Sequence, residues 1–262
     1  LEQDFDGFTV AVPAPLHFQV ARKIIESGKS VLVEKPMTLS AETSKELVEL
    51  AQRKGVQLMV GHVLLFHPAI RKIKKIIDSG ELGNLYYLYS NRLNLGTVRT
   101  EENVFWSFAP HDISVLDYFV GHPAEKIVSK GSKFLQEEVY DVTITQLDYP
   151  NNVHAHIFVS WLHPFKEQRL VVIGSKGMVS FDDATAEKEI KFYDKRIDFE
   201  KGIPVKVENP TRIIPYEQKQ PLSEELKYFI EHLDKKIEIA DGQSGLEVVK
   251  VLEEAEKKIQ VG

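Results

Sequence analysis

A lysine stands where a predicted buried strand ends. The apolar run 31–33 predicts a short strand, and Lys35 follows it between Glu34 and Pro36. Ligands of open α/β sheets bind beyond the carboxyl ends of the strands, so this position favours a functional amine. An amine held out of water has a lowered pKa and could take the proton of a hydroxyl while a hydride leaves the same carbon. The alternative is an ordinary lysine that reaches solvent and pairs with Glu34.

Two histidines are further candidates. His111 precedes Asp112 near the start of a helix predicted over 109–119, where its ring can face a cleft, and histidine titrates nearest to working pH. His17 follows another predicted strand end, close to Pro13. Either ring could instead cap a helix or bind backbone groups.

The strands and helices that must position these residues follow one pattern in the first third of the chain and another pattern after it. Apolar runs over 8–12, 31–33 and 58–60 alternate with amphipathic helices, which predicts a parallel sheet of the Rossmann type covered on both faces. Gly28 ends the first helix, Ser40 can cap the second, and Pro68 suits the first position of the third.

The pattern is different after residue 83. A strand over 85–92 is followed by the helix over 109–119, and alternation over 153–161 predicts a strand with one open face. Gly174–Gly177 favours a hairpin, and Ser244 opens a capping box for the last helix. We therefore expect a dinucleotide-binding part over 1–82 and a second α/β domain over 83–262 with a large, mostly antiparallel open sheet. The last helix could pack back on the first part.

Composition excludes several classes of function. The chain has no cysteine, so disulfides, thiolate metal sites and cysteine nucleophiles are excluded. A net charge of −6 argues against nucleic acid as a partner. No apolar run approaches the roughly 20 residues of a membrane span, and Leu1–Asp4 lack a basic leader, so we expect no membrane partner and a cytoplasmic protein. His154 and His156 share one strand face without an obvious third ligand, which favours an exposed or interfacial face over a metal site.

The two strand-end segments resemble the hallmark of a known family. Their pattern is Ala-x-Pro-x-x-x-His followed by Gly-Lys-x-Val-x-x-Glu-Lys-Pro, and it is similar to that of the glucose-fructose oxidoreductase, inositol dehydrogenase and rhizopine-catabolism (Gfo/Idh/MocA) superfamily. The matching residues are Ala11, Pro13, His17, Gly28, Lys29, Val31, Glu34, Lys35 and Pro36. The resemblance continues through Gly61-His62, Phe66-His67-Pro68, His111-Asp112 and 173–177.

The resemblance implies a Rossmann domain that binds NAD or NADP and an α/β domain whose open sheet often mediates assembly, here into a homo-dimer or homo-tetramer. It places Lys35 near nicotinamide and substrate, often before a cis proline, and His111 as an acid/base. Cofactor contacts are expected from Pro13, His17, Glu34, Lys35 and Pro36. The family commonly has an acidic residue four positions before the histidine, where this sequence has Ser107.

The stretch 91–112 is similar to a narrower branch, bacterial enzymes that oxidise the 3-hydroxyl of UDP-N-acetylglucosaminuronate or related sugars. Six residues are expected to contact substrate. Arg92 and Arg99 suit a carboxylate or phosphate, Asn94 and Asn103 suit hydroxyls, Trp106 could stack, and Asp112 could orient His111. Each could instead be a solvated loop residue or, for Trp106, part of the core.

The sequence lacks the Gly-x-Gly-x-x-Gly loop that binds the pyrophosphate of a dinucleotide. The resemblance matches 8–12 to a later Rossmann strand, so we expect a longer chain with roughly 60 to 70 residues, about two βα units, before the present start. The residue that selects NAD or NADP would lie there.

The resulting hypothesis is hydride transfer between a secondary alcohol of a sugar or nucleotide-linked sugar and nicotinamide. Alternatives are a non-catalytic dinucleotide or sugar sensor, a glycosidase that oxidises its substrate transiently with NAD, and a plain binding module. The presence of both Lys35 and His111 favours the dehydrogenase, because a sensor has no need of them.

Overall fold

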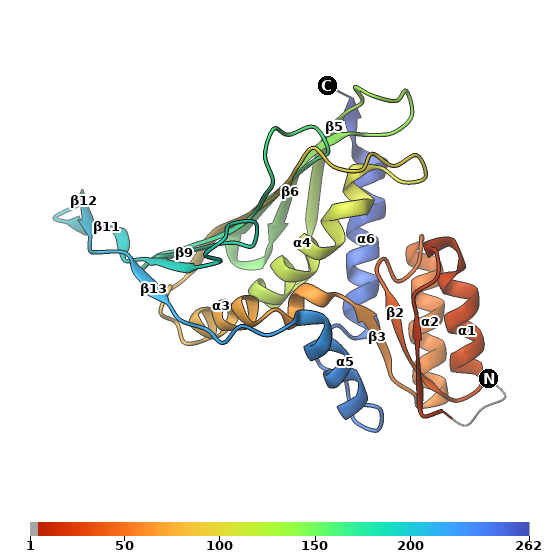
Figure 1. Ribbon diagram of the computed structural model, residues 1–262. Coiled ribbons are helices and arrows are strands. Elements are labelled where there is room, and N and C mark those ends of the chain that lie inside the picture. Colours follow the sequence, from red (N-terminus) through yellow and green to blue (C-terminus); the bar gives the residue numbers. More distant parts are fainter. Residues whose placement is uncertain (1–4, 262) are drawn as a thin grey trace.

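A computed structural model describes residues 5–261 (Figure 1). The first sheet is parallel, with strands β1 (Gly7–Val10), β2 (Ser30–Glu34) and β3 (Leu58–Gly61) in the order β1-β2-β3. This arrangement confirms the predicted Rossmann-type sheet. The carboxyl ends of the three strands therefore lie along one edge, with Lys35 directly after β2. The expectation of no basic leader concerned Leu1–Asp4, and these four residues lie outside the described part of the chain.

Helices cover both faces of this sheet. Helices α1 (His17–Glu26) and α2 (Ala41–Lys54) pack on the face that carries Val31 and Val33. Helix α5 (Pro221–Glu231) and the turn after it approach the other face, where the Ser30 hydroxyl donates to the Leu233 carbonyl at 3.3 Å. The predicted helix signals are confirmed, because Ser40 caps α2 by accepting from the Thr43 amide and Gly28 has φ of 76°.

The second sheet has nine strands in the order β13-β10-β9-β8-β4-β7-β6-β5-β14. Neighbours are antiparallel except β4 with β7 and β5 with β14, so the sheet is mostly antiparallel, as predicted. The expected hairpin at Gly174–Gly177 joins β8 to β9. The strands are β4 (Leu85–Leu93), β5 (Lys126–Ser132), β6 (Val142–Tyr149), β7 (Val153–Ser160), β8 (Glu167–Gly174), β9 (Met178–Asp182), β10 (Ile190–Tyr193), β13 (Arg212–Ile214) and β14 (Gln260–Val261).

A separate two-stranded hairpin, β11 (Lys195–Glu200) with β12 (Ile203–Glu208), projects from this sheet between β10 and β13. Among residues 5–261, no helix combines the length and the apolar character that a membrane span requires.

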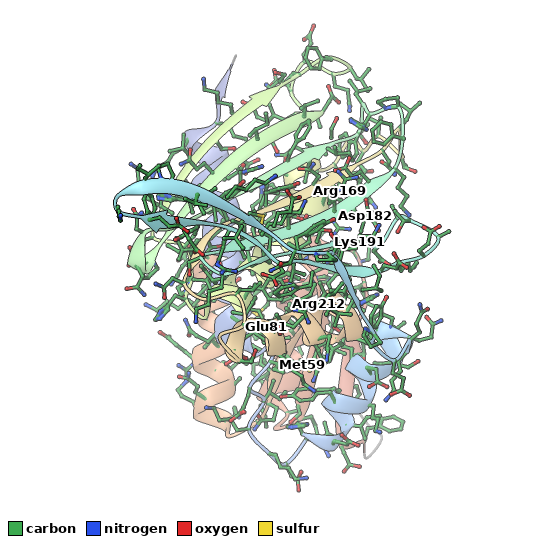
Figure 2. All side chains as sticks on the ribbon, turned by 90° about the vertical axis from the view of Figure 1, so that its left-hand side faces the viewer. Met59, Glu81, Arg169, Asp182, Lys191 and Arg212 are labelled. Carbon is green, nitrogen blue, oxygen red and sulfur yellow. The ribbon has the colours of Figure 1, made fainter. Side chains whose placement is uncertain are left out.

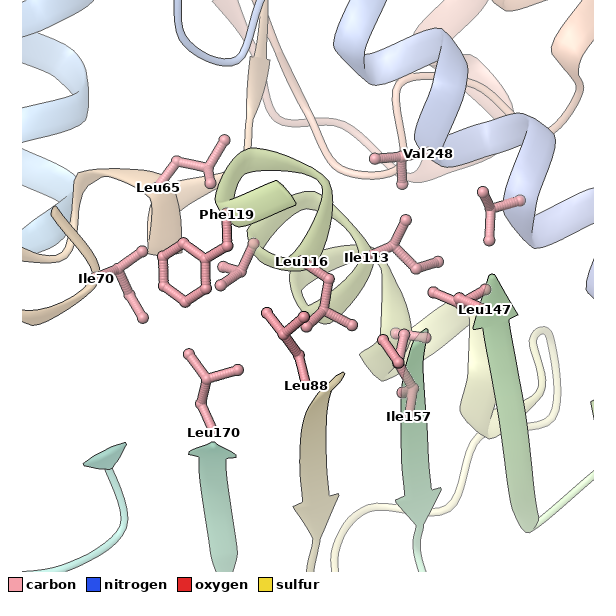
Figure 3. Packing of buried hydrophobic residues seen from close by; sticks show 14 of the residues in the cluster. Leu65, Ile70, Leu88, Ile113, Leu116, Phe119, Leu147, Ile157, Leu170 and Val248 are labelled. Atoms are coloured by element: carbon pink, nitrogen blue, oxygen red, sulfur yellow. The ribbon is translucent and has the colours of Figure 1, made fainter. Parts of the chain in front are cut away.

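Helix α4 (Val104–Val120) lies in the core between the large sheet and the rest of the chain. Figure 3 shows Ile113, Leu116 and Phe119 of this helix directed toward the buried side chains of the sheet, among them Leu88 and Ile157. Short helix α3 (Pro68–Asp78) packs beside it.

The predicted start of this helix was wrong. The helix begins at Val104 rather than near 109, because Asn103 caps it by accepting from the Phe105 and Trp106 amides. Pro110 lies inside the helix and removes a hydrogen bond, at a cost of about 3 kcal/mol. Burial of Val104, Phe105 and Trp106 contributes about 1.5–3 kcal/mol for each side chain, which outweighs that cost.

Helix α6 (Gly242–Lys258) connects the two sheets. Its start also differs from the prediction, because the N-cap is Asp241 and Ser244 is the residue whose amide it binds. The helix packs on β3 so closely that a Cβ on Gly245 would lie 2.4 Å from Val60 Cγ2, and one on Gly242 would lie 2.7 Å from Leu58 Cδ2. The glycines thus set the distance between α6 and the strand that ends beside the site.

We predict that Gly245→Ala destabilises the protein by about 1–2 kcal/mol in urea unfolding. Alanine is favoured over glycine in a helix by about 1 kcal/mol, but overpacking against a buried, β-branched Val60 costs about 1–3 kcal/mol. Gln243→Ala, on the exposed side of the same turn, is the control and should change stability by less than about 0.5 kcal/mol. Equal stability of the wild type and Gly245→Ala would contradict this packing.

Candidate active site

Lys35 leaves the end of β2 and reaches helix α4. The Lys35-Pro36 peptide is cis. The Lys35 ammonium donates to the backbone carbonyl of Ser107 at 3.0 Å. Burial lowers the pKa of Lys35, although Glu102 and Glu34 partly oppose the shift. The position at which the family commonly has an acidic side chain therefore offers a main-chain carbonyl, which binds the amine without holding it charged as a carboxylate would.

Two uncharged imidazoles lie close to this amine. His62 follows β3, and burial together with Lys35 lowers its pKa to about 3. His111 projects from α4, and burial lowers its pKa well below the ordinary value, with Arg92 and Lys35 adding to the effect. Both His62 ring nitrogens and His111 Nδ1 have no hydrogen-bond partner within residues 5–261. The end of β3 and helix α4 thus carry buried ring nitrogens without partners close to Lys35.

Arg92 has its charge neutralised within the protein. Its Nε and Nη2 bind the two oxygens of Asp112 at 3.1 Å each, and the Ser90 hydroxyl donates to the same carboxylate at 2.7 Å. Asp112 is buried, so the pair forms a fixed wall beside His111. The expectation that Asp112 orients the His111 ring is not met, because the carboxylate is taken by Arg92 and Ser90.

A cavity of about 280 Å³ opens between the two sheets at Lys35. Asn94 and Arg99 line it, as do the previously unassigned Lys166 and Gln168. Arg99 pairs with Glu102 at 3.2 Å, whereas Lys166 is exposed and is in no ion pair within the described chain. A second cavity of about 210 Å³ adjoins it and shares Arg92, His111 and Gln168. The first cavity is cationic, which favours a ligand with a negatively charged group.

Asn103 and Trp106 were expected to contact a sugar, but in the structure they contact helix α6. Asn103 caps α4, its amide donates to Glu256 Oε1 at 2.8 Å, and Trp106 Nε1 donates to Glu256 Oε2 at 3.0 Å. Trp106 is 7% exposed. Both side chains therefore fasten α4 to α6 and leave no polar atom for a sugar.

The strand-end residues form the edge of the site. His17 is buried, and its Nδ1 and Nε2 each lie 2.8 Å from a backbone oxygen, of Pro36 and Val12 respectively. The ring thus joins the loops after β1 and β2 and has no nitrogen left for a cofactor. Pro13 lies in the first of these loops, and Glu34 Oε2 accepts from the Lys35 amide at 3.3 Å.

Several residues of this region were missed by sequence reasoning. His62 had a usable signal, because it follows a predicted parallel strand directly. Lys166 and Gln168 had none, since they reach the site only through the antiparallel register that sets Gln168 opposite Arg92.

Two family models match the chain. One describes an oxidoreductase family with an NAD-binding Rossmann fold and matches residues 1–62. The other describes the GFO/IDH/MocA C-terminal domain and matches residues 70–180. The chain belongs to the GFO/IDH/MocA oxidoreductase family, and its first part belongs to an NAD-binding Rossmann fold.

Relatives with assigned names agree with this membership. The scyllo-inositol 2-dehydrogenase (NAD+) of Bacillus subtilis is 27% identical over 185 residues, 66% of this chain and 54% of the relative. The D-xylose 1-dehydrogenase (NADP+) of Haloarcula marismortui is 26% identical over 259 residues, 92% of this chain and 69% of the relative. The chain spans about half the length of several curated relatives that it matches.

Solved structures share the fold. The UDP-N-acetylglucosamine 3-dehydrogenase GnnA of Acidithiobacillus ferrooxidans superposes with a TM-score of 0.85 at 21% identity, over 98% of this chain and 79% of the other. At this identity the likeness establishes the architecture alone.

A buried carboxyl group on α5 lies near Glu34. Glu225 of α5 is 0% exposed, and neither carboxyl oxygen has a hydrogen-bond partner within the described chain. Burial raises the pKa of Glu225 to about 8, and Glu34 contributes to the shift. The folded protein therefore keeps a proton on Glu225 that an unfolded chain releases near pH 4.3.

This linkage predicts a pH-dependent difference between the wild type and Glu225→Gln. From about pH 4.5 to pH 8 the folded state binds the extra proton, so wild-type stability falls with rising pH by up to about 1.4 kcal/mol per unit. Glu225→Gln lacks this loss and should gain stability relative to the wild type between pH 5 and pH 8.5, measured by urea unfolding. The exposed Glu231→Gln is the control, and parallel profiles for Glu225→Gln and the wild type would refute the assignment.

Proposed function

We propose that this chain forms part of an NAD(P)-dependent oxidoreductase that acts on a secondary alcohol of a sugar, and that the sugar is nucleotide-linked. The observation that carries the proposal is the Lys35 amine, desolvated at the end of a parallel strand beside two uncharged histidines. The residues proposed to act on substrate are Lys35 and His111, with Asn94, Arg99 and Lys166 as binding groups. Asn103, Trp106 and Asp112 are assigned to the scaffold.

Lys35 is proposed as the base. Its lowered pKa gives it a larger neutral fraction near neutral pH than an ordinary lysine has, and neutral amine can take a hydroxyl proton. His111 is too weak a base to compete, but its unpaired Nδ1 can bind the substrate oxygen and fix its direction. In the reverse direction Lys35 returns the proton to the carbonyl oxygen.

The residues present fit the nicotinamide half of a dinucleotide. The strand-end edge formed by Pro13, Glu34, Lys35 and Pro36 adjoins the unpaired nitrogens of His62 and His111, which supports placing the reactive ring there. A bound nicotinamide supplies the hydride chemistry. The protein's part is to hold the alcohol, exclude water and move the proton.

The charge of the cavity supports an anionic substrate. Arg92 is neutralised by Asp112 and Arg99 pairs with Glu102, which leaves Lys166 as the exposed cation of the lining that is in no ion pair within the described chain. A diphosphate or a uronate carboxylate supplies the missing charge. Among the solved structures, that of the UDP-N-acetylglucosamine 3-dehydrogenase carries a name consistent with such a substrate.

The proposal divides the chain into a dinucleotide-binding part over 1–82 and a substrate-binding part over 83–262, and it includes self-association through the open face of the large sheet. His156 stacks on Tyr89 on this face, with ring centroids 5.1 Å apart, and Tyr87, Val128 and Ile144 are exposed on it. An aromatic and apolar centre of this kind is typical of a protein interface.

Lys35→Met tests the proposal. In the full protein, kcat/KM for oxidation of a nucleotide-sugar, followed by the absorbance of reduced nicotinamide, should fall about 10²–10⁴-fold because the proton acceptor is lost. Lys54→Met, at the exposed end of α2, is the matched control. Turnover by Lys35→Met equal to that of the wild type would remove the mechanism.

Lys166→Met tests the substrate class. Loss of one exposed cation should raise KM for a nucleotide-linked sugar about 5-fold with kcat retained, because roughly 1 kcal/mol of binding is lost in both ground and transition states. KM for the corresponding neutral sugar should not change. An equal effect on both substrates would exclude Lys166 as an anion contact.

A further inference from the structure

The β11–β12 hairpin forms a two-stranded sheet of its own, separate from the large sheet. Its two strands pair only with each other within the described residues, and Figure 1 shows them projecting beyond the end of the large sheet. Lys201 and Gly202 form its turn with φ of 51° and 83°, which suits a tight two-residue connection. An isolated two-stranded hairpin is marginally stable in water.

Both faces of the hairpin expose apolar side chains. Ile197 and Phe199, 55% and 71% exposed, share one face. Ile203, 66% exposed, lies on the other face with Val205 and Val207. The hairpin therefore exposes apolar side chains to water on both of its faces. Exposed apolar groups gathered in this way indicate contact with a partner.

A groove on the open face lies at the base of this hairpin. It encloses about 420 Å³, with Tyr89, Val171 and Met178 among its lining and Glu187 at its rim. Tyr193 and Lys195, where the chain passes from β10 into the hairpin, line the same groove. Figure 2, viewed from the side toward which the hairpin projects, shows Arg169, Asp182 and Lys191, which also line this groove.

We propose that the hairpin is an arm that binds the open-face groove of a second copy of this chain. Because arm and groove adjoin on one surface, a two-fold axis beside them lets each copy place its arm on the other, which closes the dimer. The inference rests on the proposed self-association through the open face and names the element that secures it.

Charge supports a second copy as the occupant. The arm's other cations are already paired, Lys195 and Lys206 with Glu208 and Arg196 with Asp194 and Asp198. Within residues 5–261 this leaves Lys201 at the tip without an acidic partner. At the groove, Arg169 pairs with Asp182 and Lys191 with Glu189, whereas Glu187 is exposed and in no ion pair. The unpaired cation of the arm thus matches the unpaired acid of the groove.

The exposed apolar side chains of the arm and the open face supply part of the area that a dimer needs. Ile197, Phe199 and Ile203 on the arm and Tyr87, Val128 and Ile144 on the open face are each 43–71% exposed. At about half of the 150–250 Å² that an aromatic side chain can bury, Phe199 and Tyr87 supply about 200 Å² per chain. The four aliphatic side chains and the polar groups of the groove would have to supply the rest of the roughly 800 Å² per partner of a stable interface. A lipid surface suits the arm less well, because acidic Asp198, Glu200 and Glu208 offset its lysines.

The first experiment measures dimerisation of the full protein by sedimentation velocity over a concentration series. Phe199→Ser with Ile203→Ser should weaken the dimer at least about 100-fold, because two exposed anchors lose their burial. Ile230→Ser, which removes a 66% exposed apolar residue from α5, is the control and should leave the dimer unchanged. Lys201→Glu and Glu187→Lys should each weaken it about 5-fold, and the two together should restore it.

The second experiment uses the absence of cysteine from the chain. Protein with only Lys201→Cys, mixed with protein carrying only Glu187→Cys, should form a disulfide-linked heterodimer, whereas Lys54→Cys mixed with Glu187→Cys should not. A dimer that survives loss of Phe199 and Ile203, or the absence of the cross-link, would overturn the arm but leave association through the sheet face standing.

Two further outcomes are decisive. A wild-type protein that is monomeric at every concentration would overturn the arm and the self-association together. The wild type could float with lipid vesicles while the Phe199→Ser, Ile203→Ser protein does not, and both could dimerise equally. That result would overturn the dimer arm in favour of binding to a lipid surface. Hydride transfer per subunit is read separately in each variant, so failure of the arm is distinguishable from failure of the Lys35 mechanism.

Discussion

The structure depends on keeping a lysine out of water where the two sheets meet. Lys35 has a backbone carbonyl of α4 as its close partner, so the amine stays in place only while α4 is fixed relative to β2. Two contacts provide that fixation. Glu256 of α6 binds Asn103 and Trp106 at the beginning of α4, and glycines of α6 allow that helix to lie directly on β3. Lys35 is thus held by a chain of packed elements, β3 to α6 to α4, rather than by neighbours in sequence.

In the same region, charged side chains that are paired lie close to histidines that are uncharged. Arg92 is balanced by Asp112, and Arg99 by Glu102, while His62 and His111 stay uncharged because burial disfavours their protonated forms. A carboxylate at the Lys35 contact would have favoured the ammonium, and a carbonyl there favours it less. Cations paired with carboxylates and uncharged histidines therefore lie side by side around Lys35.

Local signals were sufficient for much of the fold and for part of the site. The three apolar runs, the Ser40 cap and the Gly174–Gly177 turn act over a few residues, and each was predicted correctly. The position of Lys35 directly after a buried strand was predicted correctly, because a charged residue next to a short apolar run is visible in the sequence. Its catalytic role stays a prediction. The start of α4 was not found, because a proline near an apolar segment has the same appearance whether it begins a helix or lies inside one.

Side chains whose partners are distant in sequence could not be placed. Asn103 and Trp106 have the types expected of sugar contacts, and only the position of Glu256, about 150 residues later, shows that they are fasteners. Glu225 is similar, since nothing around it in α5 indicates that its carboxyl lies close enough to Glu34 for that charge to raise its pKa. The register between β4 and β8 decides which residues line the cavity. The sequence pattern within either strand does not reveal that register.

At one border of the large sheet the outermost strand, β13, has only three residues. It therefore exposes few unpaired amides and carbonyls, so another chain has little template on which to add a strand there. The sheet is nine strands wide, and this border disfavours its lateral growth into a ribbon.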